Sequence, residues 1–223
     1  MKRGIPLPIL LLCLLLPAGL LGCQGAPSAS RSVTVPANMD RFLMVSFRDI
    51  AEEVGHDQGV RSPLSGQVFV TGEVAGEAED YLTSLAMDRL RERVSIKLIS
   101  PDRLRDLRPA SSRAEVAELD LLREIGRSLE ADGVFAGYVF RYRNRVGGNY
   151  SVTEPASVAF DIVLLRVSDG RVIWSRFFDE TQKSLTEDLF GLGAFLERDG
   201  QWITTDRMAR VAMDELMESL RIP

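Results

Sequence analysis

The residue with the best-defined chemistry in this chain of 223 residues is Cys23. It closes the tetrapeptide Leu20-Leu21-Gly22-Cys23, at the end of an apolar run that two basic residues precede. The apolar core of that run, Ile9 to Leu16, is too short to span a bilayer, and the whole segment has the form of a secretory signal peptide. A thiolate placed here can take a diacylglyceryl group, and cleavage after Gly22 frees its amine for a further acyl chain.

This pattern is the lipobox of bacterial lipoproteins, and it predicts that residues 1–22 are removed and that the mature chain starts at a lipidated Cys23. Stable anchoring takes more than one acyl chain, which a triacylated cysteine supplies. Gln24 stands where Asp is the usual signal for inner-membrane retention, so we expect the periplasmic face of the outer membrane rather than the inner membrane. The alternative is an ordinary signal peptide followed by a chance cysteine.

A second polar feature lies in the segment 134–145, which alternates as a strand. One face is aromatic, with Tyr138, Phe140 and Tyr142. The other face carries the candidate partner-binding residues Arg141, Arg143 and Arg145. Guanidinium groups in a row can bind phosphates, carboxylates or an acidic protein surface. Alternatively the row is a solvated face paired with acidic residues such as Glu154 or Asp161.

Residues for catalysis or metal binding are sparse. His56 is the single histidine, with Glu52, Glu53 and Asp57 as its nearest carboxylates. A histidine metal site needs converging ligands, and a surface histidine is the simpler interpretation. No Gly-x-Ser-x-Gly motif or phosphate-binding lysine loop is present. We therefore expect no catalytic residue, no metal and no cofactor, which makes a periplasmic hydrolase the least favoured alternative.

Composition limits the partners and the covalent chemistry. The chain has 27 basic and 32 acidic residues, and loss of Lys2 and Arg3 with the signal peptide leaves 25 and 32, a net charge near −7. A nucleic-acid-binding protein would carry a basic surface instead. Cys13 would leave with the signal peptide, so the mature chain would keep only the acylated Cys23 and could form no disulfide.

The remaining sequence predicts one domain on a short tether. Residues 24–38 are rich in Gly, Pro and Ser and would join Cys23 to a globular domain over 39–223, spanning at most about 50 Å. This domain includes a long loop at 48–72, with a short strand at 67–71, and a C-terminal extension at 180–223. Apolar periodicity predicts strands at 41–47, 94–99, 134–145, 158–167 and 171–178. It predicts helices at 73–93, from Ser112 to about Asp132, and at 205–220.

The element order βαβαβββα predicts an α+β (α/β-like) fold, with a small mixed β-sheet packed by two to three helices. Three segments resemble a class of bacterial envelope lipoproteins that includes CsgG, LpoB and the N-terminal domain of TolB. They are Met44-Val45-Ser46-Phe47-Arg48-Asp49, the segment Ala131 to Val139 that begins Ala-Asp-Gly, and the predicted hairpin from Phe160 to Ser175. The resemblance covers about residues 40 to 178. The segments 48–72 and 180–223 are longer than its pattern needs.

The resemblance implies a non-enzymatic lipoprotein that binds another envelope protein as an adaptor, activator or assembly factor. The loop 48–72 and the arginine row are the candidate contact surfaces. A CsgG-like oligomeric secretion component is the alternative, and it requires two added membrane hairpins in each subunit. The sequence offers one candidate, at 139–160. Its arginines would be poorly placed against lipid.

Overall fold

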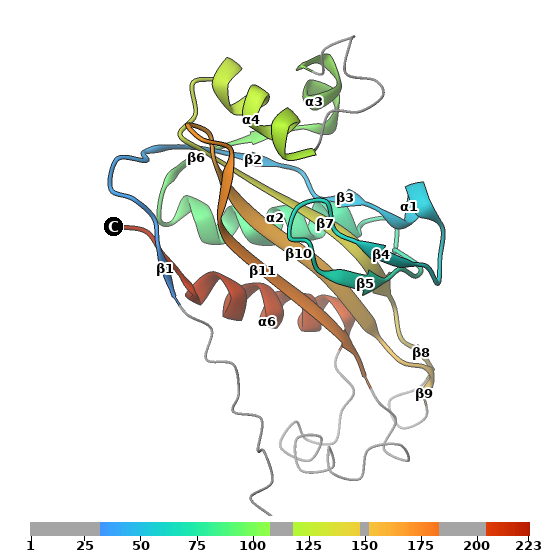
Figure 1. Ribbon diagram of the computed structural model, residues 1–223. Coiled ribbons are helices and arrows are strands. Elements are labelled where there is room, and N and C mark those ends of the chain that lie inside the picture. Colours follow the sequence, from blue (N-terminus) through green and yellow to red (C-terminus); the bar gives the residue numbers. More distant parts are fainter. Residues whose placement is uncertain (1–31, 108–117, 148–151, 183–203) are drawn as a thin grey trace, which may run out of the picture. The chain divides into compact units, whose positions relative to one another are not determined.

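A mixed β-sheet of six strands organises the folded part of the chain (Figure 1). The computed structural model describes residues 32–107, 118–147, 152–182 and 204–223. In spatial order the strands are β11 (Arg171–Thr181), β10 (Ser157–Arg166), β7 (Gly133–Arg143), β2 (Arg41–Val45) and β6 (Ser95–Ile99), with the short β3 (Arg48–Asp49) beside β7. The β2 strand is parallel to β6 and β7, whereas β10 is antiparallel to β7 and β11. The predicted α+β fold with a mixed sheet is confirmed.

The central strands are apolar on both sides because elements cover both faces of the sheet. Every residue of β10 except Arg166 is buried, as are the first eight residues of β7. Near-continuous apolar runs are typical of such strands. The predicted central strand near residue 41 is β2, and the predicted tight turn at Ser168-Asp169-Gly170 joins β10 to β11, with Gly170 at a φ of 73°.

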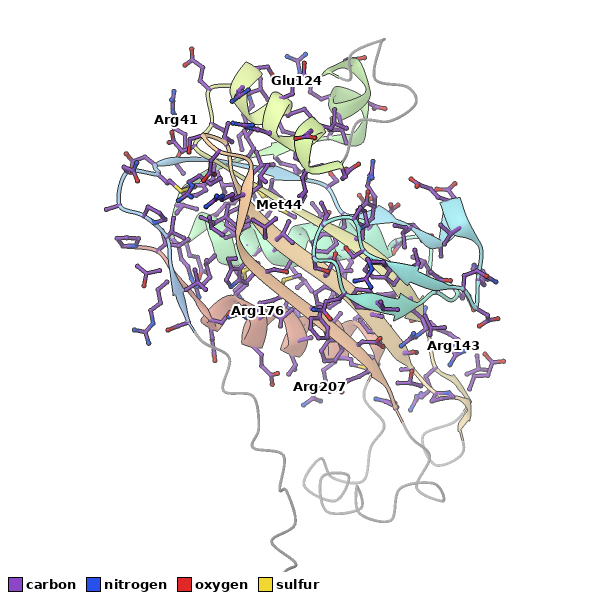
Figure 2. The ribbon with its side chains drawn as sticks, in the orientation of Figure 1. Arg41, Met44, Glu124, Arg143, Arg176 and Arg207 are labelled. Atoms are coloured by element: carbon purple, nitrogen blue, oxygen red, sulfur yellow. The ribbon has the colours of Figure 1, made fainter. Side chains whose placement is uncertain are left out.

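One side of the sheet, here called the helix face, is covered by α2 (Ala78–Arg91) and α6 (Thr205–Glu218). The hydroxyl of Thr204 caps α6 by accepting the Arg207 N–H at 3.2 Å. The apolar stripe of α6 packs against aromatic residues of the sheet, among them Phe135 and Trp174. The buried residues of this stripe are Met208, Ala209, Ala212, Met213 and Met217. Figure 2 shows Met44 of β2 among the side chains of the interior.

The other side, here called the hairpin face, is covered by α4 (Glu118–Ser128), the hairpin of β4 (Gly59–Arg61) and β5 (Val68–Val70), and the short helices α1 (Ala51–Val54) and α3 (Pro101–Leu107). Gly126 lets α4 approach closely, since a Cβ there would lie 2.4 Å from Val167. The segment 48–72, expected to be a long loop with a short strand at 67–71, contains more structure: β3, α1 and the hairpin, of which β5 is the expected strand. The predicted helix start at Ser112 lies outside the described residues.

A β-bulge corrects the predicted alternation of β7. Val139 pairs with Phe160 and Arg141 with Ala159, so Phe140 is an extra residue on its strand. Phe140 therefore packs into the hairpin face, whereas Tyr142 packs into the core of the helix face. The α2 helix also starts later than expected, because the segment before it pairs with this end of β7: the Tyr142 N–H donates to the Glu73 carbonyl at 2.8 Å.

The ends of the described chain are joined. Strand β1 (Val33–Thr34) pairs in parallel with β12 (Leu220–Arg221), and Val35 is buried. The folded chain therefore begins within the segment expected to be a tether. Gly22, Cys23, the signal peptide and most of the predicted tether lie outside the described residues. A small hairpin of β8 (Val146–Gly147) and β9 (Val152–Glu154) follows β7. No helix in the described parts is long and apolar enough to cross a membrane.

Candidate partner-binding surface

The two contact surfaces that the sequence predicted, the loop 48–72 and the arginine row, lie side by side. The end of β7 meets the β4–β5 hairpin at Arg141, whose guanidinium donates to the Val70 carbonyl at 2.7 Å and to the Asp179 carboxylate at 2.6 Å. It also bonds the hydroxyl of Ser157. Only 13% of the Arg141 side chain is exposed. This arginine therefore joins the hairpin to β7, β10 and β11 and has its partners inside the domain.

The other two arginines are placed differently. Arg143 ends β7 next to β8 (Figure 2) and is half-buried. Its carbonyl accepts the Thr205 hydroxyl at 3.1 Å, and its Nε has no hydrogen-bond partner among the described residues. Arg145 follows the strand and is also half-buried. A role of these two residues in partner binding stays a prediction. Neither Glu154 nor Asp161 forms an ion pair with any of the three in the described structure.

A buried carboxylate fixes the hairpin to the sheet. Asp161 lies in the middle of β10 with none of its surface exposed. It accepts the hydroxyl of Ser65 at 2.5 Å and the backbone N–H of Tyr138 at 3.1 Å. Burial raises the pKa of Asp161 from 3.8 to about 6, against the opposing effect of hydrogen bonds from Ser62 and Ser65. The loop between β4 and β5 is thus held by a titratable group.

Aromatic packing adds to this attachment. The Phe69 ring of β5 stacks on Phe140 of β7, with centroids 3.9 Å apart and planes inclined by 14°. It also meets the edge of Phe177 on β11 at 5.9 Å. Offset stacking and edge-to-face contacts are favourable beyond the apolar area that they bury. The short hairpin is therefore attached through β7, β10 and β11.

The outer side of the same strand is apolar and exposed. Val68 and Val70 flank Phe69 and are 61% and 53% exposed, which we define as the β5 surface. Val54 of α1 and Phe177 add two more exposed apolar side chains from this part of the structure. Exposed apolar groups gathered on one element are typical of a protein contact site.

A polar cluster lies at the base of this region. The Arg48 guanidinium bonds the Tyr138 hydroxyl, lies over its ring at 4.8 Å from the centroid, and pairs with Glu118 of α4 at 3.1 Å. Next to it, the Asp49 N–H donates to the Glu79 carboxylate at 2.6 Å, and burial raises the pKa of both Asp49 and Glu79. These contacts position β3 against α2 and α4.

The structure gives no catalytic arrangement to His56, which is exposed just beyond α1. The described residues contain no group of three or more His, Cys, Asp or Glu side chains that could hold a metal. A cavity of about 340 Å³ lies near the start of α2, where the Tyr142 hydroxyl donates to Asp206 at 2.7 Å. Burial, followed by the hydrogen bond to Asp206, raises the pKa of Tyr142.

Apart from Arg141, the residues that hold the hairpin were not among the predicted site residues. Phe69 belongs to the short strand predicted at 67–71, but nothing in the sequence showed that it stacks on β7. Asp161 was visible as the one carboxylate within an apolar strand. A carboxylate in such a place needs a hydrogen-bond donor from another part of the chain. This need was the one sign in the sequence that another segment packs on Asp161.

Comparison with known proteins concerns the fold. No known family model matches the chain, and no curated protein resembles it in sequence. The PelC dodecamer from Paraburkholderia phytofirmans is similar in structure, with 17% identity, a TM-score of 0.49, and coverage of 86% of this chain and 95% of that chain. The LpoB C-terminal domain from Salmonella enterica has 17% identity and a TM-score of 0.37, with 66% and 86% covered.

Lipoprotein GNA1162 from Neisseria meningitidis is also similar, with 10% identity and a TM-score of 0.37 over 72% of this chain and 98% of that chain. The LpoB C-terminal domain, from the class that the sequence motifs resemble, is thus among the similar structures. In structure the chain resembles bacterial envelope lipoproteins.

Proposed function

We propose that this protein is a lipid-anchored lipoprotein of the periplasmic face of the outer membrane, and that it acts without catalysis by binding another envelope protein through the β5 surface. The observation that carries the proposal is the pair of exposed valines on a hairpin that Asp161, Arg141 and Phe69 hold in place. A preorganised apolar surface binds with little further loss of conformational entropy.

The anchor limits where the partner can lie. Lipidation of Cys23 would leave residues 24–32 between the acyl chains and β1, which fits a tether of at most about 30 Å. The β5 surface would then work close to the membrane that holds the lipid. A partner that is itself in that membrane, or that lies next to it, is within reach.

A photo-crosslinking amino acid at Val70 tests this binding role in the cells that make the protein. We expect the crosslinker at position 70 to give one discrete adduct with a second protein. The matched control is Val211, a valine of α6 that is 48% exposed. The double variant Val68→Glu, Val70→Glu should remove the partner while the domain keeps its melting temperature. Equal adducts from positions 70 and 211 would contradict the proposal.

The anchor has its own test. Replacement of Cys23→Ala should move the protein from the outer-membrane fraction to another fraction, and mass spectrometry of the parent should find acylated Cys23 at its N-terminus. A parent protein with an unmodified Cys23 would reject the lipoprotein assignment without bearing on the β5 surface. The two parts of the proposal therefore fail separately.

A further inference from the structure

The cavity of about 340 Å³ lies where the two helices of the helix face begin, and the proposed function does not use it. Its volume is within the range of sites for small ligands, about 300–1,000 Å³. Residues 76–78 line it at the start of α2, Tyr142 and Asn144 line it at the end of β7, and Asp206 lines it in the first turn of α6. Three elements that are distant in the sequence therefore meet at one cavity.

The lining of this cavity is acidic. Glu77 and Asp206 contribute two carboxylates, and no Lys or Arg of the described residues lines the cavity. Arg210 donates to the Tyr81 hydroxyl at 3.2 Å, but its side chain is exposed and is not part of the lining. A helix N-terminus carries about half a positive charge, and both α2 and α6 begin here. Two carboxylates against two helix ends leave about one negative charge, which one cationic group would neutralise.

The open hydrogen-bonding positions in the cavity are mostly acceptors. The Tyr142 hydroxyl donates to one carboxylate oxygen of Asp206 at 2.7 Å, and the other oxygen accepts no hydrogen bond in the described structure. Tyr142 is 2% exposed, so it holds Asp206 from a buried position. The carboxylate of Glu77 and the amide of Asn144 also make no hydrogen bond to a described residue. The cavity therefore has several oxygen atoms that a ligand with many N–H groups could fill.

We propose that this cavity binds one guanidinium group on an extended stem, from an arginine side chain in a peptide or from a free guanidine. A guanidinium has five N–H donors and no acceptor, which matches the open oxygens of Glu77, Asp206 and Asn144. It is more weakly hydrated than an ammonium group, and it can lie against an aromatic ring such as that of Tyr81, which also lines the cavity. The β5 surface lies on the hairpin face, so this proposal does not depend on the binding role proposed for it.

An NMR titration of the full-length protein in mild detergent tests the ligand. N-acetyl-arginine amide should shift the Asn144 side-chain amide and the Gly76 N–H saturably, with a dissociation constant on the order of 1 mM. N-acetyl-citrulline amide has nearly the same shape without the charge, and it should bind about tenfold more weakly. Free arginine separates the two sources. Weaker binding than that of the capped amide assigns the site to arginine within a peptide, and equal or tighter binding assigns it to a free guanidine.

Three variants locate the binding. Asp206→Asn keeps an acceptor for Tyr142 but removes a charge, so the affinity for N-acetyl-arginine amide should fall about tenfold. Glu77→Gln changes an exposed side chain without a hydrogen bond in the described structure, and it keeps the proposal open to rejection if Asp206→Asn loosens α6. Its expected loss of affinity is about two- to fivefold. The matched control is Glu215→Gln, which removes the same charge about 13 Å further along α6, beyond a Debye length, and should leave the affinity unchanged.

The same measurements can reject the proposal. Equal affinities for the arginine and citrulline amides would show that the cavity does not select a cation. Equal losses from Glu77→Gln and Glu215→Gln would show that the ligand binds through the overall charge of the protein and not in the cavity. The absence of any saturable shift at Gly76 and Asn144 would show that the cavity does not bind the group at all. Each of these outcomes would overturn the proposal and leave the role of the β5 surface untouched.

Discussion

The core of the helix face and the β4–β5 hairpin on the other face are held by different forces. On the helix face, α2 and α6 bury an almost wholly apolar core around Trp174, with polar contacts such as Arg89–Asp214 at its margin. On the hairpin face, a hairpin of two three-residue strands has little apolar area of its own. It relies on Asp161, Arg141 and one aromatic stack. Stability is therefore expected to be global for the core of the helix face and local for the hairpin, whereas α4 packs on the hairpin face through an apolar core of its own.

The largest expected effect compares the two faces directly. Trp174 is 2% exposed, meets Phe135 edge-on, and donates its indole N–H to Ser219 at 3.0 Å. Trp174→Ala should lower the free energy of unfolding by about 3–5 kcal/mol, measured by denaturant unfolding. Phe69→Ala removes an equally buried ring, but the hairpin can detach before the sheet unfolds. Phe69→Ala should therefore lower the free energy of unfolding of the domain less than Trp174→Ala does. Proteolysis between residues 59 and 70 should become faster. Equal losses for both variants would show that the hairpin unfolds together with the sheet.

The next effect is a dependence on pH that originates on the hairpin face. Burial raises the pKa of Asp161 from 3.8 to about 6, so the folded domain holds a proton that the unfolded chain has released between these values. The stability that this proton contributes to the folded domain is fully present below about pH 4 and is lost as the pH rises through 6. It amounts to at most about 3 kcal/mol.

Asp161→Asn should remove this part of the pH profile, because an amide can accept from Tyr138 and donate to Ser65 without ionising. Urea unfolding at pH 4.5 and pH 7.5 measures it. The raised pKa values of Asp49 and Glu79 act in the same direction and should remain in the variant. An unchanged difference between the two pH values would contradict the assignment to Asp161.

A smaller effect comes from Arg141. Arg141→Met keeps much of the apolar stem but leaves the Val70 carbonyl and the Asp179 carboxylate without this donor. We expect a loss of about 1–3 kcal/mol in the free energy of unfolding, together with faster amide exchange in β5. Arg143→Met, from the end of the same strand, is the matched control and should change exchange in β5 little. If both variants act alike, Arg141 does not hold the hairpin.

The sequence predicted the helix face better than the hairpin face, for physical reasons. Apolar periodicity reports burial, and it located the helices and strands that bury the most area. The Ala-Asp-Gly motif also has a visible reason: the Asp132 carboxylate accepts the N–H groups of Asp40 and Arg41, at 3.0 and 2.9 Å. Hydrogen bonds between distant segments leave no such period, so the attachment of the hairpin was missed.

The candidate site shows the same limit in one strand. Alternation predicted Arg141 on the face opposite Phe140 and Tyr142, but the extra residue at Phe140 changed which side chains share a face. A bulge is defined by how the strand pairs with its partner strand, and the partner strand lies about 20 residues away in the sequence. The register therefore could not be found in the residues of β7 alone.

The smallest expected effect isolates one hydrogen bond of the hairpin. Ser65→Ala removes the hydroxyl that donates to Asp161, and the loss in the free energy of unfolding should be about 1 kcal/mol at pH 7.5. Because this bond holds down the pKa of Asp161, the pKa should rise further in the variant, which NMR titration of the carboxyl carbon measures. Ser84→Ala, from α2 on the helix face, removes a hydroxyl that bonds only the Tyr81 carbonyl of its own helix in the described structure, and it should leave that pKa unchanged. A Ser65→Ala variant with an unshifted Asp161 would mean that the carboxylate is held by the sheet and not by the hairpin, and the contrast between the two faces would then rest on Arg141 and Phe69.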